Sequence, residues 1–169
     1  MEQFVNVIII RHPKAHILDN IKVKKNTILI NAGDGDNEHP TQALLDLLTI
    51  YYCNNTNEKV KFIKNHKIDF SNLSITLVGD LKHSRTIHSL IKLLCLYNNI
   101  IFNLISPKQL QCSKELKKHI LRSNCKYNEF IKYNSIINNT EVLYMTRIQK
   151  ERFSSEKEYE QVKNSYNLT

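Results

Sequence analysis

The stretch Asn31–Ile50, NAGDGDNEHPTQALLDLLTI, contains the pattern that decides how this chain folds. Two of the chain's three glycines flank an acidic loop, and His-Pro-Thr-Gln then opens an apolar helix. Pro40 suits the first helical position, where its missing N–H costs nothing, so we expect His39 near the N-cap and Gln42 about one turn on. The expected buried side of the helix carries Leu44, Leu45, Leu47 and Leu48. A helix start with free N–H groups, a histidine and a glutamine favours an anionic or carbonyl-bearing ligand. The alternative is an ordinary capped helix on a glycine turn.

Apolar runs bounded by turns alternate with helical periodicity along the chain. Strands are expected at Phe4–Ile10, Thr27–Ile30, Leu73–Val78, Ile100–Ile105 and Glu141–Met145, and helices at Pro40–Tyr52, Arg85–Tyr97, Gln109–Ser123 and Ser154–Asn164. This alternation predicts an α/β fold of parallel sheets with helices on both faces. The polar stretch Asn54–Ser71 is the expected domain boundary. The part before it has too few elements to cover a parallel sheet, so we expect that domain to be incomplete.

Composition excludes several classes of function. The formal net charge of +8 can indicate anionic small substrates, but Lys and Asn are scattered through loops such as Asn54–Lys67 and Lys114–Lys132, which favours a plain compositional bias. The charge does not favour nucleic acid, because the sequence has neither a recognition-helix motif nor an aromatic stacking platform. The sequence contains no run of about eighteen apolar residues, so no membrane span is expected, and its first residues lack the pattern of a signal peptide. We therefore expect a cytoplasmic protein.

The four cysteines do not follow a metal-binding or disulfide pattern. They are Cys53, Cys95, Cys112 and Cys125, and none forms a C-x-x-C pair. No group of His and Cys has zinc-finger spacing. We interpret them as reduced thiols and expect no metal site.

Arginines follow the predicted strands at the points where ligands bind open α/β sheets. Arg11 follows the first strand, and Arg85 begins the helix after Leu73–Val78. Arg147 and Gln149 follow the last strand. Forked arginines bind phosphate and carboxylate oxygens, although each could also be a plain surface arginine. The side chains not taken as site residues are His12, Lys82, His83, His88 and the surface ion-pair run Lys150-Glu151-Arg152.

Four segments together resemble the aspartate carbamoyltransferases of the aspartate/ornithine carbamoyltransferase family. They are IIIRHP (Ile8–Pro13), the NAGDG…HPTQ stretch, LVGDLKHSRTIHSL (Leu77–Leu90) and VLYMTRIQKERF (Val142–Phe153), in the family's order. The sister ornithine enzymes have a segment resembling HPCQ and a different acidic loop. Thr41, the NAGDG loop and MTRIQKER therefore favour the aspartate enzymes.

The resemblance implies two parallel-sheet α/β domains of the carbamoyltransferase type. Residues 1–53 would be the C-terminal part of a carbamoyl-phosphate-binding domain plus the linking helix, and residues 54–169 most of an aspartate-binding domain. By resemblance Arg11, His39 and Gln42 contact carbamoyl phosphate, with Arg11 and His39 as the catalytic donors. Arg85, Arg147 and Gln149 bind L-aspartate. The reaction would give N-carbamoyl-L-aspartate for pyrimidine synthesis without a cofactor or metal, and an intact family member would be a homotrimer.

The chain also departs from the family pattern. Ser84 replaces the usual glycine before Arg85, where it can cap the helix. The sequence has no S-T-R-T motif, no serine/lysine loop and no proline-leucine-proline motif. We therefore expect a central fragment with little activity of its own. Two alternatives stay open: an ornithine carbamoyltransferase, which paired arginines disfavour, or a non-catalytic chain that binds a partner subunit or an amino acid.

Overall fold

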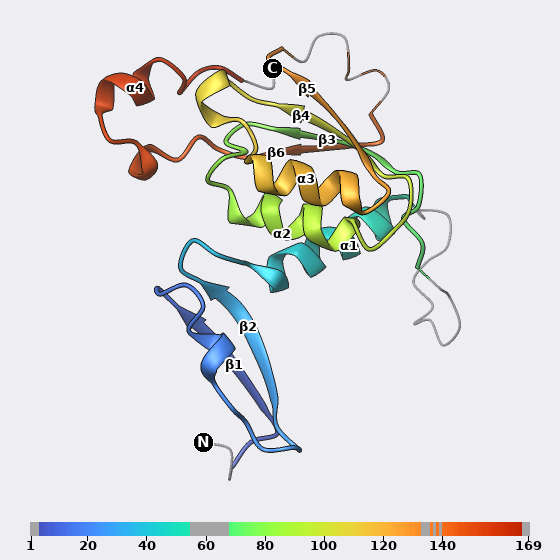
Figure 1. Cartoon of the computed structure of the whole chain (residues 1–169), viewed down its shortest axis with the longest axis vertical. Coiled ribbons are helices and arrows are strands. Elements are labelled where there is room, and N and C mark those ends of the chain that lie inside the picture. Colours follow the sequence, from blue (N-terminus) through green and yellow to red (C-terminus); the bar gives the residue numbers. More distant parts are fainter. Residues whose placement is uncertain (1–3, 55–67, 133–135, 137, 139, 167–169) are drawn as a thin grey trace.

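The computed structural model describes residues 4–54, 68–132, 136, 138 and 140–166 of the chain. Its strands form two separate sheets (Figure 1). The first contains β1 (Val7–His12) and β2 (Ile28–Asp34), and the second has the order β5 (Lys126–Phe130), β4 (Ile101–Ile105), β3 (Ser74–Val78) and β6 (Val142–Met145). Every strand pair is parallel, as the sequence predicts. The expected boundary Asn54–Ser71 falls largely outside the described residues.

Helices α2 and α3 lie on one face of the four-stranded sheet, and α1 packs on α2 and connects this part of the chain to the first sheet (Figure 1). The helices are α1 (Pro40–Asn54), α2 (Arg85–Leu94), α3 (Lys114–Arg122) and α4 (Glu156–Glu160), with short 3-10 turns η1 (Leu18–Asn20), η2 (Lys108–Leu110) and η4 (Lys150–Arg152). In the described part of the chain, no helix is long and apolar enough to cross a membrane.

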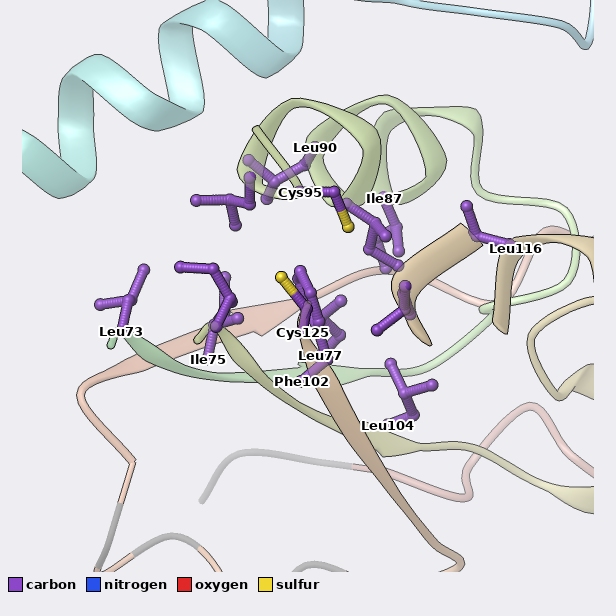
Figure 2. Packing of buried hydrophobic residues seen from close by; sticks show 14 of the residues in the cluster. Leu73, Ile75, Leu77, Ile87, Leu90, Cys95, Phe102, Leu104, Leu116 and Cys125 are labelled. Atoms are coloured by element: carbon purple, nitrogen blue, oxygen red, sulfur yellow. The ribbon is translucent and has the colours of Figure 1, made fainter. Parts of the chain in front are cut away.

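The main hydrophobic core lies between the four-stranded sheet and α2 (Figure 2). The helix contributes side chains at helical spacing, which are Ile87, Leu90, Ile91 and Leu94. Alternate residues of the strands meet them, among them Ile75 and Leu77 of β3 and Phe102 and Leu104 of β4. This is the expected pattern, with period 3.6 in the helix and period 2 in the strands.

The opposite face of the sheet carries a ladder of polar side chains instead of helices. Asn103 Nδ2 donates to Thr76 Oγ1 at 3.4 Å, and Asn128 Nδ2 donates to Asn103 Oδ1 at 3.0 Å. Thr76 Oγ1 is also hydrogen-bonded to Thr140 Oγ1 at 2.6 Å. Among the described residues, the expectation of helices on both faces is therefore met on one face only. Hydrogen bonds satisfy the buried polar groups on the other face.

The prediction of a leucine-lined buried side on α1 is wrong for three of its four members. The residues that α1 buries are Ala43, Leu47 and Ile50, all less than 10% exposed. By contrast, the exposed leucines are Leu44 at 58%, Leu45 at 54% and Leu48 at 45%. The helix packs on α2 along one narrow stripe, and the other leucines lie on its flanks. A leucine-rich helix does not indicate by itself which stripe is buried.

Some element boundaries also differ from those predicted. β1 begins and ends later than expected, at Val7–His12, and the predicted terminal helix shortens to Glu156–Glu160. The helix predicted at Gln109–Ser123 becomes η2 and α3, because Ser113 caps α3 by accepting a hydrogen bond from Leu116 N at 3.2 Å. The edge strand β5 was not predicted. Its sequence, KYNEF, is too polar to show the pattern of a buried strand.

Candidate functional site

The predicted site residues lie at, or soon after, the carboxyl ends of the parallel strands. Arg11 lies near the end of β1, and residues 35–39 join β2 to α1. Arg85 is the first residue of α2, and Arg147 follows β6. This is the edge at which open α/β sheets bind ligands.

A cavity of about 570 Å³ brings four of the six predicted residues together. They are His39, Arg85, Arg147 and Gln149. The rest of the lining consists of Gly35, His83, Ser84, Thr86, Thr146, Glu151 and Arg152. Since guanidinium and imidazole groups dominate, the cavity suits a ligand with more than one negatively charged group.

Arg11 lies in an adjoining cavity of about 460 Å³. Its lining also includes His12, Pro13, Gly35, Asp36, Arg85 and Arg152. Gly35, Arg85 and Arg152 line both cavities, so the two spaces are neighbours with Arg85 between them. Arg11 and His39 therefore contribute to adjoining cavities rather than to the same one.

Gln42 lines neither of these two cavities. Its Nε2 donates to Asp46 Oδ1 at 2.8 Å, one turn further along α1. The amide is thus engaged with its own helix. A role in ligand binding would require this hydrogen bond to open.

The surroundings of His39 favour its neutral form, in which one ring nitrogen donates a hydrogen bond. Burial, together with the positive charges of Arg85 and Arg11, lowers the pKa of His39 below its ordinary value. The backbone N–H of Gln42 donates to His39 Nδ1 at 3.4 Å, so Nδ1 is the acceptor nitrogen. The proton of the neutral ring then lies on Nε2. An N–H group of this kind can donate to an oxygen that gains negative charge.

Both predicted aspartate-binding arginines already have protein partners. Arg85 donates to the carbonyl oxygen of Gly35. Arg147 makes a two-pronged contact with Glu151, with Nη1 donating to Oε2 at 3.1 Å. These contacts raise the pKa of Arg147 and lower that of Glu151 to about 2. The pair is exposed and hence worth little net energy, so a ligand carboxylate can replace Glu151 at low cost.

The cavity also contains residues that the sequence did not single out. Arg152, assigned to surface ion pairs, does lie 3.8 Å from Asp36 but also lines both cavities. His83 was not taken as a site residue, yet it lines the larger cavity, where Nδ1 lies 3.1 Å from Asp80 Oδ2. Spacing within the motifs VGDLKHSR and TRIQKER was the available signal for both residues.

Ser84 occupies the N-cap position of α2 but does not cap the helix with its side chain. Its hydroxyl is hydrogen-bonded to Thr86 Oγ1 at 3.1 Å and to Thr146 Oγ1 at 3.4 Å. Ser84 therefore links the start of α2 to the loop after β6 instead. This contact connects the segments that carry Arg85 and Arg147.

The described residues contain no cluster of three or more His, Cys, Asp or Glu side chains suited to a metal ion. Fold and site together define a class: a parallel-sheet α/β protein with an arginine- and histidine-lined cavity at its strand ends. The chain belongs to the aspartate/ornithine carbamoyltransferase family. Residues 1–52 match the family's carbamoyl-P binding domain, and residues 71–169 match its Asp/Orn binding domain.

Known relatives agree with this assignment. The chain is 42% identical to the aspartate carbamoyltransferase catalytic subunit of Clostridium novyi, over 98% of this chain and 50% of that protein. It is also 42% identical to the multifunctional protein pyr1-3 of Dictyostelium discoideum, of which it covers 7%. Thus the chain spans about half the length of the catalytic subunits that it matches.

Solved structures show the same similarity. The catalytic subunit of M. jannaschii aspartate transcarbamoylase superposes with a TM-score of 0.77 at 37% identity, over 99% of this chain and 50% of that one. Aspartate transcarbamoylase from Trypanosoma cruzi in complex with carbamoyl phosphate gives a TM-score of 0.70 at 31% identity, over 96% and 46%.

Proposed function

We propose that this chain serves carbamoyl transfer from carbamoyl phosphate to the amine of L-aspartate, in pyrimidine synthesis. Residues 1–53 would bind carbamoyl phosphate and residues 54–169 L-aspartate. The observation that carries the proposal is the cavity that places His39 beside Arg85, Arg147 and Gln149. The family assignment supports the chemistry, and the T. cruzi relative has been solved with both carbamoyl phosphate and aspartate.

In this reaction the amine nitrogen of aspartate bonds to the carbonyl carbon of carbamoyl phosphate. The bond from that carbon to the phosphate oxygen then breaks, the phosphate leaves with the bonding electrons, and the proton lost by the amine passes to the departing phosphate. The carbonyl oxygen becomes negative on the way. His39 Nε2–H and the Arg11 guanidinium would donate to this oxygen, each contributing about 3 kcal/mol to the transition state. Gln42 would join them once its hydrogen bond to Asp46 opens.

Arg85, Arg147 and Gln149 would hold the two carboxylates of aspartate. A forked guanidinium binds a carboxylate through two parallel hydrogen bonds. Arg147 already binds Glu151 in this way, so the cavity is shaped for a carboxylate at that point. The remaining hydrogen bonds orient the amine for attack, and such positioning is a large part of the catalysis of two-substrate reactions.

Ornithine is the competing substrate within the same family. Its side chain ends in a positive charge, which Arg85, Arg147 and Arg152 would repel. We therefore expect the chain, saturated with carbamoyl phosphate, to bind L-aspartate at least tenfold more tightly than L-ornithine in calorimetry. Mass spectrometry of long incubations should identify any product as N-carbamoyl-L-aspartate. Equal or tighter binding of ornithine would overturn the assignment to aspartate.

We further propose that the protein is cytoplasmic and that the intact family member to which this chain corresponds is a homotrimer. Analytical ultracentrifugation of such a full-length member tests the assembly: three times the mass of its own chain is expected, and a strict monomer at all concentrations would contradict it.

A further inference from the structure

Asp34 is a buried carboxylate held entirely by uncharged donors. Its side chain is almost fully inaccessible to water. The amide groups of Asn31 and Asn37 donate to it at 3.0 Å, the backbone N–H of His16 at 2.9 Å and that of Glu38 at 3.2 Å. Burial alone would raise the pKa of Asp34, but these four hydrogen bonds outweigh it and hold the pKa well below its usual range. The carboxylate is therefore charged at any physiological pH.

The donors come from two different segments of the chain. His16 lies in the segment that follows the end of β1, and Asn31, Asn37 and Glu38 lie in β2 and the loop that leads from it to His39. The two segments touch through Gly35, whose N–H donates to His12 O at 2.8 Å. A Cβ at Gly35 would lie 2.7 Å from backbone atoms of the first segment, so the approach is too close for any other residue. Asp34 thus ties the segment after β1, the strand that carries Arg11, to the loop that leads to His39.

The same loop is also attached to α2. The Glu38 carboxylate accepts hydrogen bonds from Ser89 Oγ and Lys92 Nζ, and the backbone N–H of His39 donates to Ser89 Oγ at 2.9 Å. Arg85 donates to Gly35 O. All of these contacts involve residues 35–39, and the Asp34 carboxylate accepts hydrogen bonds from Asn37 and Glu38 in the same stretch.

We propose that Asp34 is a positioning residue, which holds the loop of residues 35–39 so that His39 faces the cavity beside Arg85 and Arg11. The importance of Asp34 for carbamoyl transfer rests on the proposed function. The effect of Asp34 on the position of His39 does not rest on it, and this effect can be measured without any substrate.

Asp34→Asn is the sharpest substitution because it keeps the size of the side chain. An amide has one acceptor oxygen, and its NH₂ group would face donors that now bind the second carboxylate oxygen. At least one donor of the cluster then loses its acceptor and meets another donor. The buried hydrogen-bond network can no longer be fully satisfied in its present shape.

The measurement is the pKa of His39, read from its ring resonances in an NMR titration. The sign of the change separates two explanations. Loss of a nearby negative charge alone would lower the pKa of an imidazole. Release of the loop would move His39 into water and away from Arg85 and Arg11, which now lower its pKa, so its pKa would rise. We expect a rise in Asp34→Asn, and an unchanged or lower pKa would overturn the proposal.

Two further variants serve as controls for the Asp34→Asn titration. Asp19→Asn removes the same charge from an exposed carboxylate on η1, so it should leave the pKa of His39 unchanged. Asn37→Ala deletes a single donor to Asp34 and should raise the pKa in the same direction by a smaller amount, even if Asp34→Asn fails to fold. A rise of equal size in Asp19→Asn, or no rise in Asn37→Ala, counts against the proposal.

Titration with carbamoyl phosphate then tests whether the loop position that Asp34 maintains matters for binding this substrate. We expect Asp34→Asn to bind carbamoyl phosphate at least tenfold more weakly than the unmodified chain. If the unmodified chain does not bind it at all, the proposed function fails, whereas the pKa result for His39 still decides the role of Asp34.

Discussion

Cys53 is exposed near the end of α1, whereas Cys95 and Cys112 are buried. Burial raises the pKa of the Cys95 thiol to about 12 and that of Cys112 to about 11, so both stay protonated near neutral pH. Because the thiolate is the reactive form, we predict that iodoacetamide alkylates Cys53 in the folded chain and reaches the other two only after denaturation. Peptide mass mapping measures this, and equal rates at the three sites would contradict it.

Gly79 joins β3 to the segment before α2 and has a φ angle of +119°. A Cβ there would lie 2.2 Å from the carbonyl oxygen of Thr146, the residue before Arg147. We predict that Gly79→Ala lowers the free energy of unfolding by more than about 3 kcal/mol, since the clash adds to the strain of the backbone angle.

Gly33→Ala is the matched control for this prediction. Gly33 has a similar φ of +114°, but the atoms nearest to its Cβ would belong to the His39 ring, at an ordinary 3.5 Å or more. It should cost about 1–3 kcal/mol from backbone strain alone. Urea denaturation of both variants gives the comparison, and a larger loss in Gly33→Ala would refute the account of Gly79.

At the scale of single residues, a place in the candidate site could be predicted only for residues that follow a recognisable local sequence pattern. Arg11, Arg85 and Arg147 follow apolar runs, and the ends of parallel strands lie at one edge of a sheet. Asp34 and Gly35 gave no such signal, because their partners His16 and Pro13 are distant in sequence. The hydrogen bond from Gln42 to Asp46 could not be predicted either, since it depends on the rotamer that the Gln42 side chain adopts.

At the scale of elements, α2 and α1 bury their leucines to very different extents. Leu90 of α2 is fully buried, whereas Leu44 of α1 is 58% exposed. We predict that Leu90→Ala costs about 2–5 kcal/mol of unfolding free energy, because it leaves a cavity in the core. Leu44→Ala should change it by less than about 0.5 kcal/mol. Urea denaturation compares the two variants, and similar losses of unfolding free energy would contradict the burial of Leu90 in the core.

Element types could be predicted wherever an apolar run was long enough to show its period. Strands β3 and β4 and helix α2 lie close to their predicted ranges because their side chains meet one common core. Among the residues that the structure describes, strand β5 pairs only with β4, and its polar sequence shows no pattern of burial. Its position comes from tertiary pairing, which a short polar segment does not reveal.

For the molecule as a whole, apolar side chains gather on the surface of the first sheet and α1. Exposed members include Val7, Ile9, Ile28, Leu44 and Leu48. Patches of this kind promote association. We predict that the chain binds the dye ANS and self-associates as its concentration rises, and that Ile9→Lys reduces both effects. Leu121→Lys, at an exposed leucine of α3, is the control and should reduce them less. Light scattering tests this, and identical behaviour of the two variants would contradict it.

We propose that Arg11 and Arg147, which lie far apart in sequence, serve one two-anion site. N-(phosphonacetyl)-L-aspartate, the ligand of one T. cruzi relative structure, joins a phosphonate to an aspartate and so tests both ends at once. Calorimetry with the unmodified chain should show binding that weakens at least tenfold, about 1.4 kcal/mol, in Arg11→Ala and in Arg147→Ala. Arg122→Ala, at the exposed end of α3, should bind as the unmodified chain does. Absence of binding to the unmodified chain, or equal affinity in all the variants, would contradict the claim.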